Sequence, residues 1–419
     1  MAKDAPTAPV NRVIVVGAGA AGSMAAIFAA LSGAETLLVE RTRDGGRKIL
    51  ISGGGRCNIL PVRLDESRYV TASSPNLLRK MVRSWPLAEQ VAFFEHDLGI
   101  RLEQEAETGK YFPASHRSRD VRDGLLSHAA GKGVRLAAET LIEGVRPTAT
   151  GWRVDRHGMD SLDADAVILA TGALSVPATG SDGFGLRTLA ALGHTMHPTY
   201  AALTPLLARS AAYNGLAGVS LTVTITARSG ERTATARGGF LFTHHGYSGP
   251  SVLDVSHVAV RAKADGKPPA RLFVQWTALG DAEWERALKP QGARTVNGAL
   301  RAEMPERLAA VLLGVAGVDA TRSLAELRRE ERRRLIETLV RGELPCTGDE
   351  GYKKAEVTGG GLALDEVDPR TMESRRHPGL FVCGEALDAF GPIGGYNFLW
   401  AWATGRAAGV GAAGMGARG

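Results

Sequence analysis

A glycine-rich segment near the start of the chain has the residue types and spacing of a nucleotide-binding turn. Gly17, Gly19 and Gly22 form a GxGxxG pattern directly after residues 12–16 (RVIVV), an apolar run typical of a strand buried on both faces. Helix-forming residues follow at 23–32. The first glycine permits a tight bend, the second admits a pyrophosphate and the third lets helix pack on strand. The dinucleotide-binding residues predicted here are Gly17, Gly19, Ala20, Ala21 and Gly22.

A carboxylate ends the second predicted strand, at residues 36–40 (TLLVE). Glu40 stands eighteen residues after Gly22, where dinucleotide-binding folds place the acid that accepts hydrogen bonds from the ribose hydroxyls. An acid at this position favours FAD or NAD over NADP, because NADP carries a phosphate on that ribose. We predict that Glu40 and the adjacent Arg41 belong to the cofactor site.

Two later segments decide between FAD and NAD. Residues 166–170 form a buried strand followed by Thr-Gly, and residues 379–383 form another that leads into Gly-Glu. The strand with Thr-Gly resembles the second signature sequence of flavoproteins with two dinucleotide-binding domains. The strand with Gly-Glu resembles the element that binds the ribityl chain of FAD in those proteins. Residues 394–397 open an apolar helix, whose N-terminus would stabilise negative charge on a reduced flavin. FAD is therefore the predicted cofactor, with these binding residues: Thr171, Gly172, Gly384, Glu385, Gly394, Gly395, Tyr396 and Asn397.

Four stretches, at 47–58, 239–250, 356–374 and 379–402, resemble in order the BaiN/YhiN-type (aminoacetone-oxidase-like) NAD(P)/FAD-dependent oxidoreductases. The resemblance implies an enzyme that transfers a hydride between flavin N5 and a small organic substrate, a conjugated enone or an amine. It also implies NADH or NADPH as a transient electron donor. Phe390 stands where this family often has Asp, and Leu399 where it often has Gln. The substrate preference of any single member is therefore not carried over.

The stretch 47–58 (RKILISGGGRCN) combines positive charge with glycines that allow close backbone approach to a ligand. We predict a lid over the FAD pyrophosphate and ring, in which Ser52 and Asn58 donate hydrogen bonds. The alternative is a flexible surface loop. The residues of this stretch assigned to the cofactor site are Arg47, Lys48, Ser52, Gly54, Gly55, Arg56 and Asn58.

His244 and His245 are the candidate catalytic residues. They lie in a predicted loop near Tyr247, and an imidazole there could donate a proton to a substrate carbon or oxygen. The only histidine that follows nearby is His257, and no pair of carboxylates is close in sequence, so no metal site is predicted. The family resemblance supports a functional role for this pair, and the sequence leaves open which of the two histidines acts.

The order of patterns predicts an α/β protein with a discontinuous Rossmann-like FAD-binding domain. Residues 1–193 and 352–419 would form that domain, and residues 194–351 an inserted substrate or cap domain. Within the insertion we expect a β-rich part at 194–279 and helices at 280–342. No second GxGxxG unit is present, so a nicotinamide nucleotide would dock only transiently.

Composition limits the remaining alternatives. The chain has 419 residues, a net charge of +6 and ten lysines among its 50 basic residues. The pI of about 9.3 keeps a tRNA- or nucleic-acid-modifying flavoenzyme as one alternative, and a non-catalytic flavin-binding regulator is another. Charges of both signs alternate, so we expect a small-molecule substrate and no stable nucleic-acid partner.

The cellular setting is predicted from three absences. Three widely spaced cysteines fit no disulfide or zinc pattern, the first ten residues show no signal peptide, and no apolar run is long enough to span a membrane. We therefore expect a cytoplasmic protein without membrane contact. The sequence does not indicate an oligomeric state.

Overall fold

The chain forms two compact units in a computed structural model that describes residues 11–106, 108–210 and 212–414. Unit 1 contains the described residues up to Thr199 and from Val357 onward, and unit 2 contains Tyr200–Glu356. These boundaries lie a few residues beyond the expected 193/194 and 351/352. Residues 1–10, where the absence of a signal peptide was predicted, lie outside the described part of the chain.

A five-stranded parallel sheet forms the centre of unit 1, with the strand order β20-β10-β1-β2-β6. The neighbouring pairs are all parallel, with Val13 of β1 opposite Ala166 of β10 and Thr36 of β2. Because the strands are parallel, their carboxyl ends meet at one edge of the sheet. The strands are β1 (Arg12–Val16), β2 (Glu35–Val39), β6 (Arg135–Ala137), β10 (Ala166–Leu169) and β20 (Leu380–Val382).

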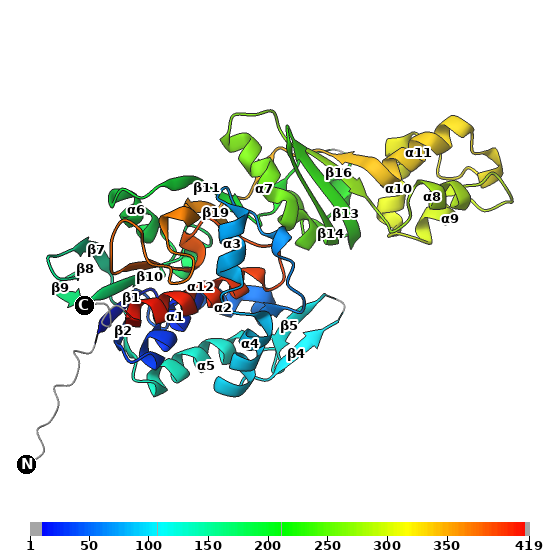
Figure 1. Cartoon of the computed structure of the whole chain (residues 1–419). Helices are drawn as coiled ribbons and strands as arrows, with labels where there is room; N and C mark the ends of the chain where they lie inside the picture. Colours follow the sequence, from blue (N-terminus) through cyan, green and yellow to red (C-terminus); the bar gives the residue numbers. More distant parts are fainter. Residues whose placement is uncertain (1–10, 107, 211, 415–419) are drawn as a thin grey trace, which may run out of the picture. The chain divides into compact units, whose positions relative to one another are not determined.

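Helices from the two ends of the chain pack against each other in unit 1. α1 (Ala20–Leu31) and α12 (Tyr396–Ala413) lie side by side, blue and red in Figure 1. A Cβ on Gly405 would lie 2.4 Å from the carbonyl oxygen of Ala21, and one on Gly409 would lie 2.2 Å from that of Ala25. Glycine at these positions therefore allows a close helix crossing. The C-terminal segment is thus built into the same domain as the N-terminal one, as the sequence predicted.

The other elements of unit 1 surround this framework. The stretch 47–58, expected to be a lid loop, instead begins with a short helix and continues as a tight turn. The elements are α2 (Arg47–Ile51), β3 (Leu60–Pro61), α3 (Pro75–Val82), α4 (Leu87–Ala92), β4 (Leu102–Glu105), β5 (Lys110–Pro113), α5 (Ser118–Gly131), β7 (Ile142–Pro147), β8 (Trp152–Arg156), β9 (Met159–Ala164), α6 (Phe184–Ala191) and β19 (Val357–Leu362).

Unit 2 has a seven-stranded antiparallel sheet with the order β17-β16-β13-β14-β15-β12-β18. One helix, α7, which the sequence analysis did not predict, packs on the sheet. The chain enters this unit through β11 (Met196–Ala202). Its strands are β12 (Leu206–Leu207), β13 (Ser220–Ser229), β14 (Arg232–Phe242), β15 (Gly246–Ser248), β16 (Arg271–Gln275), β17 (Gly342–Leu344) and β18 (Gly348–Asp349). Its helices are α7 (Pro250–Ala264), α8 (Asp281–Ala287), α9 (Val296–Arg301), α10 (Glu306–Ala316) and α11 (Arg329–Arg341).

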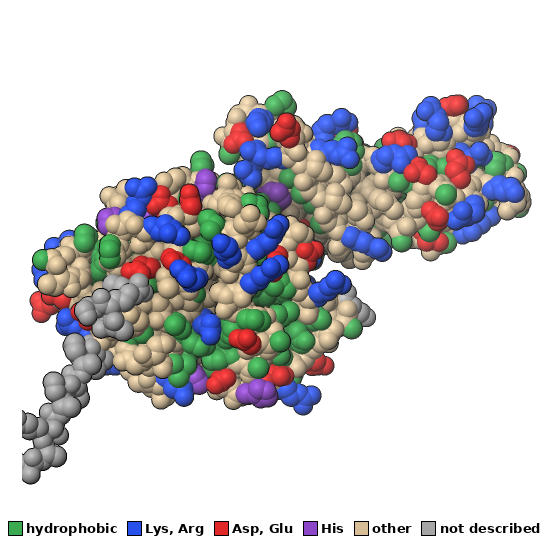
Figure 2. All heavy atoms as spheres, viewed as in Figure 1, with side chains coloured by type: hydrophobic (Ala, Val, Ile, Leu, Met, Phe, Trp, Pro, Cys, Tyr) green, Lys and Arg blue, Asp and Glu red, His purple; other side chains and the backbone are tan. Residues whose placement is uncertain are grey.

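The helical part of unit 2 carries charges of both signs, interspersed over its surface (Figure 2). Ion pairs join Arg341 to Asp281 at 2.7 Å and Arg333 to Glu330 at 2.9 Å. Such exposed pairs contribute at most about 1 kcal/mol each, so they keep the surface solvated more than they hold the fold. Within the described residues, no helix is both long enough and apolar enough to cross a membrane.

A buried charge cluster fastens the end of α6 to the segment before β20. The carboxylate of Glu366 accepts hydrogen bonds from Arg376 at 2.5 and 2.9 Å, and Oε2 lies 2.9 Å from Nδ1 of His194. The other ring nitrogen of His194 lies 3.2 Å from Oγ of Ser374. The bonds from Arg376 hold the pKa of Glu366 far below its usual value of 4.5, while burial lowers the pKa of His194. The carboxylate therefore stays charged in the folded protein.

We predict that Glu366→Gln destabilises the protein by about 1–3 kcal/mol near neutral pH, because it removes charged hydrogen bonds. The folded-state pKa is depressed, so this stabilisation is complete above the unfolded-state value and is lost as the pH falls through the folded value. Between about pH 6 and pH 3, the gap in unfolding free energy between parent and variant should stay constant down to about pH 5 and shrink steadily below that. Urea unfolding over this range measures it, with Glu89→Gln, an exposed residue of α4, as the control. A gap that does not change with pH would contradict the assignment.

Candidate functional site

Four parallel strands deliver the predicted nucleotide-binding residues to one edge of the sheet in unit 1. β1 leads into residues 17–22, β2 into Glu40, β10 into residues 171–172 and β20 into residues 384–385. The carboxyl edge of a parallel sheet is where α/β proteins bind nucleotides. Segments more than 300 positions apart in the sequence therefore meet at one candidate site.

The three positions of the GxGxxG turn contain glycine for different structural reasons. A Cβ on Gly17 would lie 2.6 Å from the carbonyl oxygen of Ala170, and one on Gly22 would lie 1.8 Å from that of Gly17. Both are therefore required by packing within the protein. A Cβ on Gly19 would meet nothing within 4 Å, so the backbone there borders open space. This is the position at which the motif lets a pyrophosphate approach.

The N-terminus of α1 presents positive charge next to Gly19. The first turn has no acidic residue and no side-chain cap. Within the described part of the chain, the backbone N–H groups of Ala20 and Ala21 have no hydrogen-bond acceptor. Unpaired N–H groups at a helix N-terminus form a ready anion site. The turn therefore fits the diphosphate of a dinucleotide.

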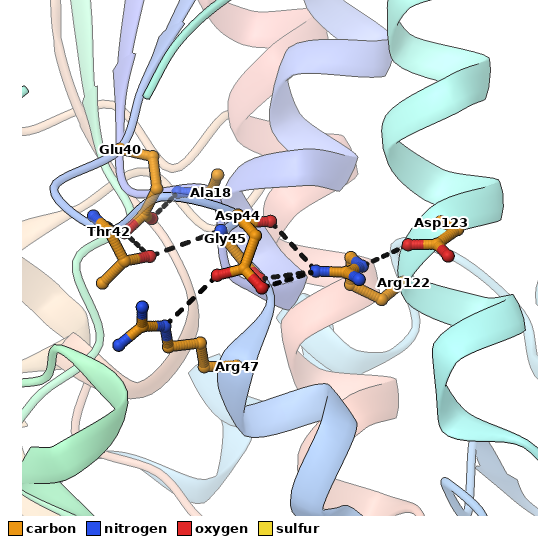
Figure 3. Close-up of polar contacts among 8 residues, drawn as sticks. All are labelled: Ala18, Glu40, Thr42, Asp44, Gly45, Arg47, Arg122 and Asp123. Carbon is orange, nitrogen blue, oxygen red and sulfur yellow. Dashed lines mark hydrogen bonds and ion pairs between the residues drawn. The ribbon is translucent and has the colours of Figure 1, made fainter. Parts of the chain in front are cut away.

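Glu40 holds this turn in place (Figure 3). Its Oε2 accepts a hydrogen bond from the N–H of Ala18 at 2.8 Å, and its Oε1 accepts two from Thr42, from N and from Oγ1, each at 2.7 Å. A carboxylate offers about four acceptor positions, so one remains on Oε2 for a ribose hydroxyl. The side chain therefore has a structural task in addition to the predicted cofactor contact.

Arg122 supports the same region from α5, and the sequence analysis missed it. Its side chain is buried, and Nη1 donates to the carbonyl oxygens of Asp44 and Gly45 at 3.2 and 3.5 Å (Figure 3). A Cβ on Gly46 would lie 2.5 Å from Cγ of Arg122, so glycine is needed for this contact. Burial acts in the opposite direction, yet hydrogen bonds from Arg47 and Arg122 lower the pKa of Asp44. In the sequence this arginine stands directly after Val121, and no motif marks it.

A second polar cluster joins the N-terminal half of unit 1 to its C-terminal segment. Nζ of Lys48 lies 2.6 Å from both Oε2 of Glu385 and Oγ of Ser175. Oε1 of Glu385 accepts hydrogen bonds from Ser175 and from the N–H of Thr358. One acceptor position remains on Oε2. The cluster brings together the predicted Lys48 and Glu385, and adds Ser175 and Thr358, which were not predicted.

The start of α12 is shaped by contacts within unit 1. Gly395 has a φ of 89°, and a Cβ there would lie 2.4 Å from the carbonyl carbon of Leu60 in β3. Packing against β3 is thus a sufficient reason for glycine at 395, whereas the sequence analysis assigned it to the approach of the flavin. Gly394 faces only the flexible side chain of Lys110, at 3.3 Å.

The side chains of Tyr396 and Asn397 also contact the protein itself. The Tyr396 hydroxyl donates to the carbonyl oxygen of Arg63, and Asn397 makes two hydrogen bonds of 2.9 Å to the backbone of Gly391. What α12 offers a ligand is therefore its backbone N-terminus. The departures noted in the sequence, Phe390 and Leu399, are both buried in unit 1.

The basic residues of the predicted site pair with carboxylates of the same unit. Arg41 donates to Asp182 at 2.7 Å, Arg47 to Asp44 at 3.3 Å, and Arg56 to Glu105 at 2.9 Å. The guanidinium of Arg56 also lies over the ring of Phe112. All three arginines keep some 40% of their side-chain surface exposed. Their charge is therefore partly neutralised but accessible.

The tight turn after α2 contains the last predicted residues of this stretch. Gly54 and Gly55 have φ values of 67° and 86° and open space beside them, so they allow close approach of a ligand. Ser52 donates to the carbonyl oxygen of Ile49 at 2.8 Å. The half-buried side chain of Asn58 has no hydrogen bond among the described residues and is free to serve a ligand. Burial raises the pKa of the neighbouring Cys57 to about 12, which keeps that thiol protonated.

The candidate catalytic histidines belong to unit 2. His244 and His245 are exposed in the loop between β14 and β15, and neither ring makes a hydrogen bond with the described residues. Tyr247, expected near them as a polar group, has its side chain buried against Phe240 and Phe242. Among the described residues no group of three or more His, Cys, Asp or Glu side chains could hold a metal ion.

The fold and this strand edge define an FAD-dependent oxidoreductase of the Rossmann type. The chain belongs to the family described as HI0933-like protein Rossmann domain, whose model matches residues 11–411. This match confirms the resemblance found in the sequence.

Two curated relatives cover nearly the whole chain. The ribosomal RNA dihydrouridine synthase of Escherichia coli (strain K12) is 32% identical over 93% of this chain and 95% of its own length. The 3-dehydro-bile acid delta(4,6)-reductase of Clostridium scindens is 30% identical over 96% and 99%.

Solved structures share the fold at lower identity. A 3-ketosteroid delta1-dehydrogenase from Sterolibacterium denitrificans has a TM-score of 0.53 at 13% identity, covering 96% of this chain and all of its own. An open-conformation flavocytochrome c3 fumarate reductase has a TM-score of 0.50 at 16% identity, covering 98% of this chain and 79% of its own. Both similarities are similarities of fold.

We predict that Glu40→Gln weakens both the turn and FAD retention. A glutamine amide would point a donor at the N–H of Ala18 or of Thr42, leaving a buried donor unpaired at a cost of about 1–3 kcal/mol. The apoprotein should lose unfolding free energy, and the purified protein should carry less FAD per chain. Thr42→Val, which removes one donor to Glu40 and keeps the carboxylate, should have a smaller effect. Full FAD content and unchanged apoprotein stability in Glu40→Gln would refute the assignment.

Proposed function

We propose that this protein reduces a carbon–carbon double bond conjugated with a carbonyl group, using bound FAD and taking electrons from NADH or NADPH. The single observation that carries the proposal is the convergence of the Gly19 turn, Glu40 and Glu385 at the carboxyl edge of one parallel sheet. FAD, when bound, supplies a hydride to the substrate.

The names of the two curated relatives support the choice of substrate chemistry. One forms dihydrouridine in ribosomal RNA and the other is a delta(4,6)-reductase of a 3-dehydro-bile acid. In both cases the bond that gains hydrogen is an alkene conjugated with a carbonyl: the C5=C6 bond of uracil and the double bonds next to a 3-oxo group. Hydride adds to the carbon remote from the carbonyl, the electron pair moves toward oxygen, and a proton completes the adjacent carbon.

In the proposed reaction, cofactor binding and proton transfer are assigned to different residues of this chain. The N–H groups at the start of α1 hold the diphosphate, and the free acceptor positions of Glu40 and Glu385 bind ribose and ribityl hydroxyls. Lys48 fixes the carboxylate of Glu385 in place. The N-terminus of α12 favours negative charge on the reduced ring. His244 or His245 donates the proton, since both imidazoles are exposed and neither ring is hydrogen-bonded to a described residue.

The purified protein should carry FAD whose absorbance is bleached anaerobically by NADH or NADPH. Mixing the reduced protein with 2-cyclohexenone or with a uridine-containing transcript should restore the oxidised spectrum and yield the saturated product. Cyclohexanone and a transcript containing dihydrouridine are the matched controls, since they lack the conjugated bond. A flavin that NADH and NADPH leave oxidised, or that no conjugated substrate reoxidises, would refute the proposed function.

Replacing the proton donor should slow only the second half-reaction. We expect His244→Ala or His245→Ala to lower the rate of flavin reoxidation by the substrate by about 10²–10⁴-fold, with reduction by NADH or NADPH unchanged. The matched control is His157→Ala, which removes an exposed histidine of unit 1 paired with Glu143. Equal rates for parent, His244→Ala and His245→Ala would exclude both histidines as proton donors.

A further inference from the structure

The unit 2 sheet has two chemically different faces. On β13, the side chains of Val223, Ile225 and Ala227 point to the core beneath α7, while the alternate residues point away. Most outward positions of the three longest strands are polar, aromatic or positively charged, and Gly239 and the exposed Leu241 of β14 are the exceptions. The polar, aromatic and charged positions include Thr222, Thr224, Thr226 and Arg228 on β13, Thr233, Thr235 and Arg237 on β14, and Arg271, Phe273 and Gln275 on β16. We call this surface the arginine–threonine face.

Positive charge on this face is only partly compensated. Arg228 lies directly opposite Arg271 in the ladder, an arrangement in which like charges repel. Arg271 is paired with Glu343 at 2.7 Å. Arg228 and Arg237 have no ion pair or hydrogen bond with any residue in the described part of the chain. The face therefore keeps two exposed guanidinium groups that an anion could neutralise.

An aromatic ring and a hollow lie beside these charges. The guanidinium carbons of Arg228 and Arg271 lie 5.6 and 4.9 Å from the ring centre of Phe273. The hollow, of about 230 Å³, is lined by Phe273 with Thr224 and Thr226 of the sheet. On its α11 side it is lined by Val340 and by Glu337, whose carboxylate is paired with Arg341 at 2.7 Å. Guanidinium planes and aromatic rings stack on unpaired bases, and hydroxyl groups donate to phosphates.

We propose that the arginine–threonine face binds single-stranded RNA, so that the substrate is a uracil base within RNA. The inference rests on the proposed function, because the uracil ring holds a conjugated alkene of the kind that function requires. Charge and chemistry favour RNA over a protein partner: the charges of the sheet face that have no partner among the described residues are arginines, the ring of Phe273 lies between guanidinium groups, and most of the remaining outward groups are hydroxyls. The proposal replaces the expectation of a small-molecule partner alone.

The test uses the full-length holoprotein and a fluorescein-labelled oligouridylate of about 20 nucleotides, followed by fluorescence anisotropy at several salt concentrations. Arg228→Gln combined with Arg237→Gln should weaken binding by about tenfold near 0.1 M salt and reduce the salt slope by about 1.4, since single strands contribute about 0.7 per phosphate contact. Phe273→Leu should weaken binding by about fivefold or more with little change in slope, because stacking is not electrostatic.

The matched control is Arg286→Gln combined with Arg333→Gln. It makes the same change in net charge in unit 2 at exposed arginines paired with Glu283 and Glu330, and it should alter the affinity by less than about twofold. The inference is overturned if the parent does not bind the oligouridylate, if the double variant binds as tightly as the parent, or if the control loses as much. Either of the last two results would mean that the arginine–threonine face binds a protein partner or no partner.

A second measurement separates this inference from the proposed function. Flavin reoxidation by 2-cyclohexenone should be unchanged in Arg228→Gln/Arg237→Gln, because that small molecule does not need the face. If the parent reduces cyclohexenone but the double variant binds RNA as tightly as the parent does, only the RNA inference fails. If the substitutions weaken RNA binding while no conjugated bond is reduced, the proposed reaction fails and the RNA-binding surface stands.

Discussion

The candidate site depends on the hydrogen bonds that the buried carboxylate of Glu40 accepts. This carboxylate lies at the end of β2 and is almost fully buried. It accepts one hydrogen bond from the N–H of Ala18 and two from Thr42. A buried anion is stable only when it is hydrogen-bonded, and here one of the donors, the N–H of Ala18, belongs to the glycine turn. The same side chain thus fixes the shape of the turn and keeps one acceptor position for a ribose hydroxyl.

Most of the predicted cofactor-binding side chains are used by the protein itself. Arg41, Arg56, Tyr396 and Asn397 each have partners within unit 1. What remains for FAD is largely backbone: the N–H groups at the start of α1 and the positive-φ glycines at 54 and 55. Side chains such as Arg122 hold neighbouring backbone in place, here the carbonyl groups of Asp44 and Gly45.

The two units contribute different kinds of chemistry. Unit 1 presents helix N-termini and carboxylates at one sheet edge, which suits a dinucleotide. Unit 2 presents histidines on a hairpin loop and an open sheet face with uncompensated arginines.

Local patterns of residues account for the nucleotide-binding framework of unit 1. The apolar run before Gly17, the glycine spacing and the acid after β2 predicted a βαβ unit and its ligand class, since turns and strands are set by neighbouring residues. Which side chains contact one another across long sequence separations depends on the tertiary structure. Ser175 and Thr358 join Glu385 from 210 and 27 positions away, Arg122 reaches Asp44 across 78, and Gly395 is required by the backbone of Leu60. No local pattern encodes such contacts, because they arise from how strands and helices pack after they have formed.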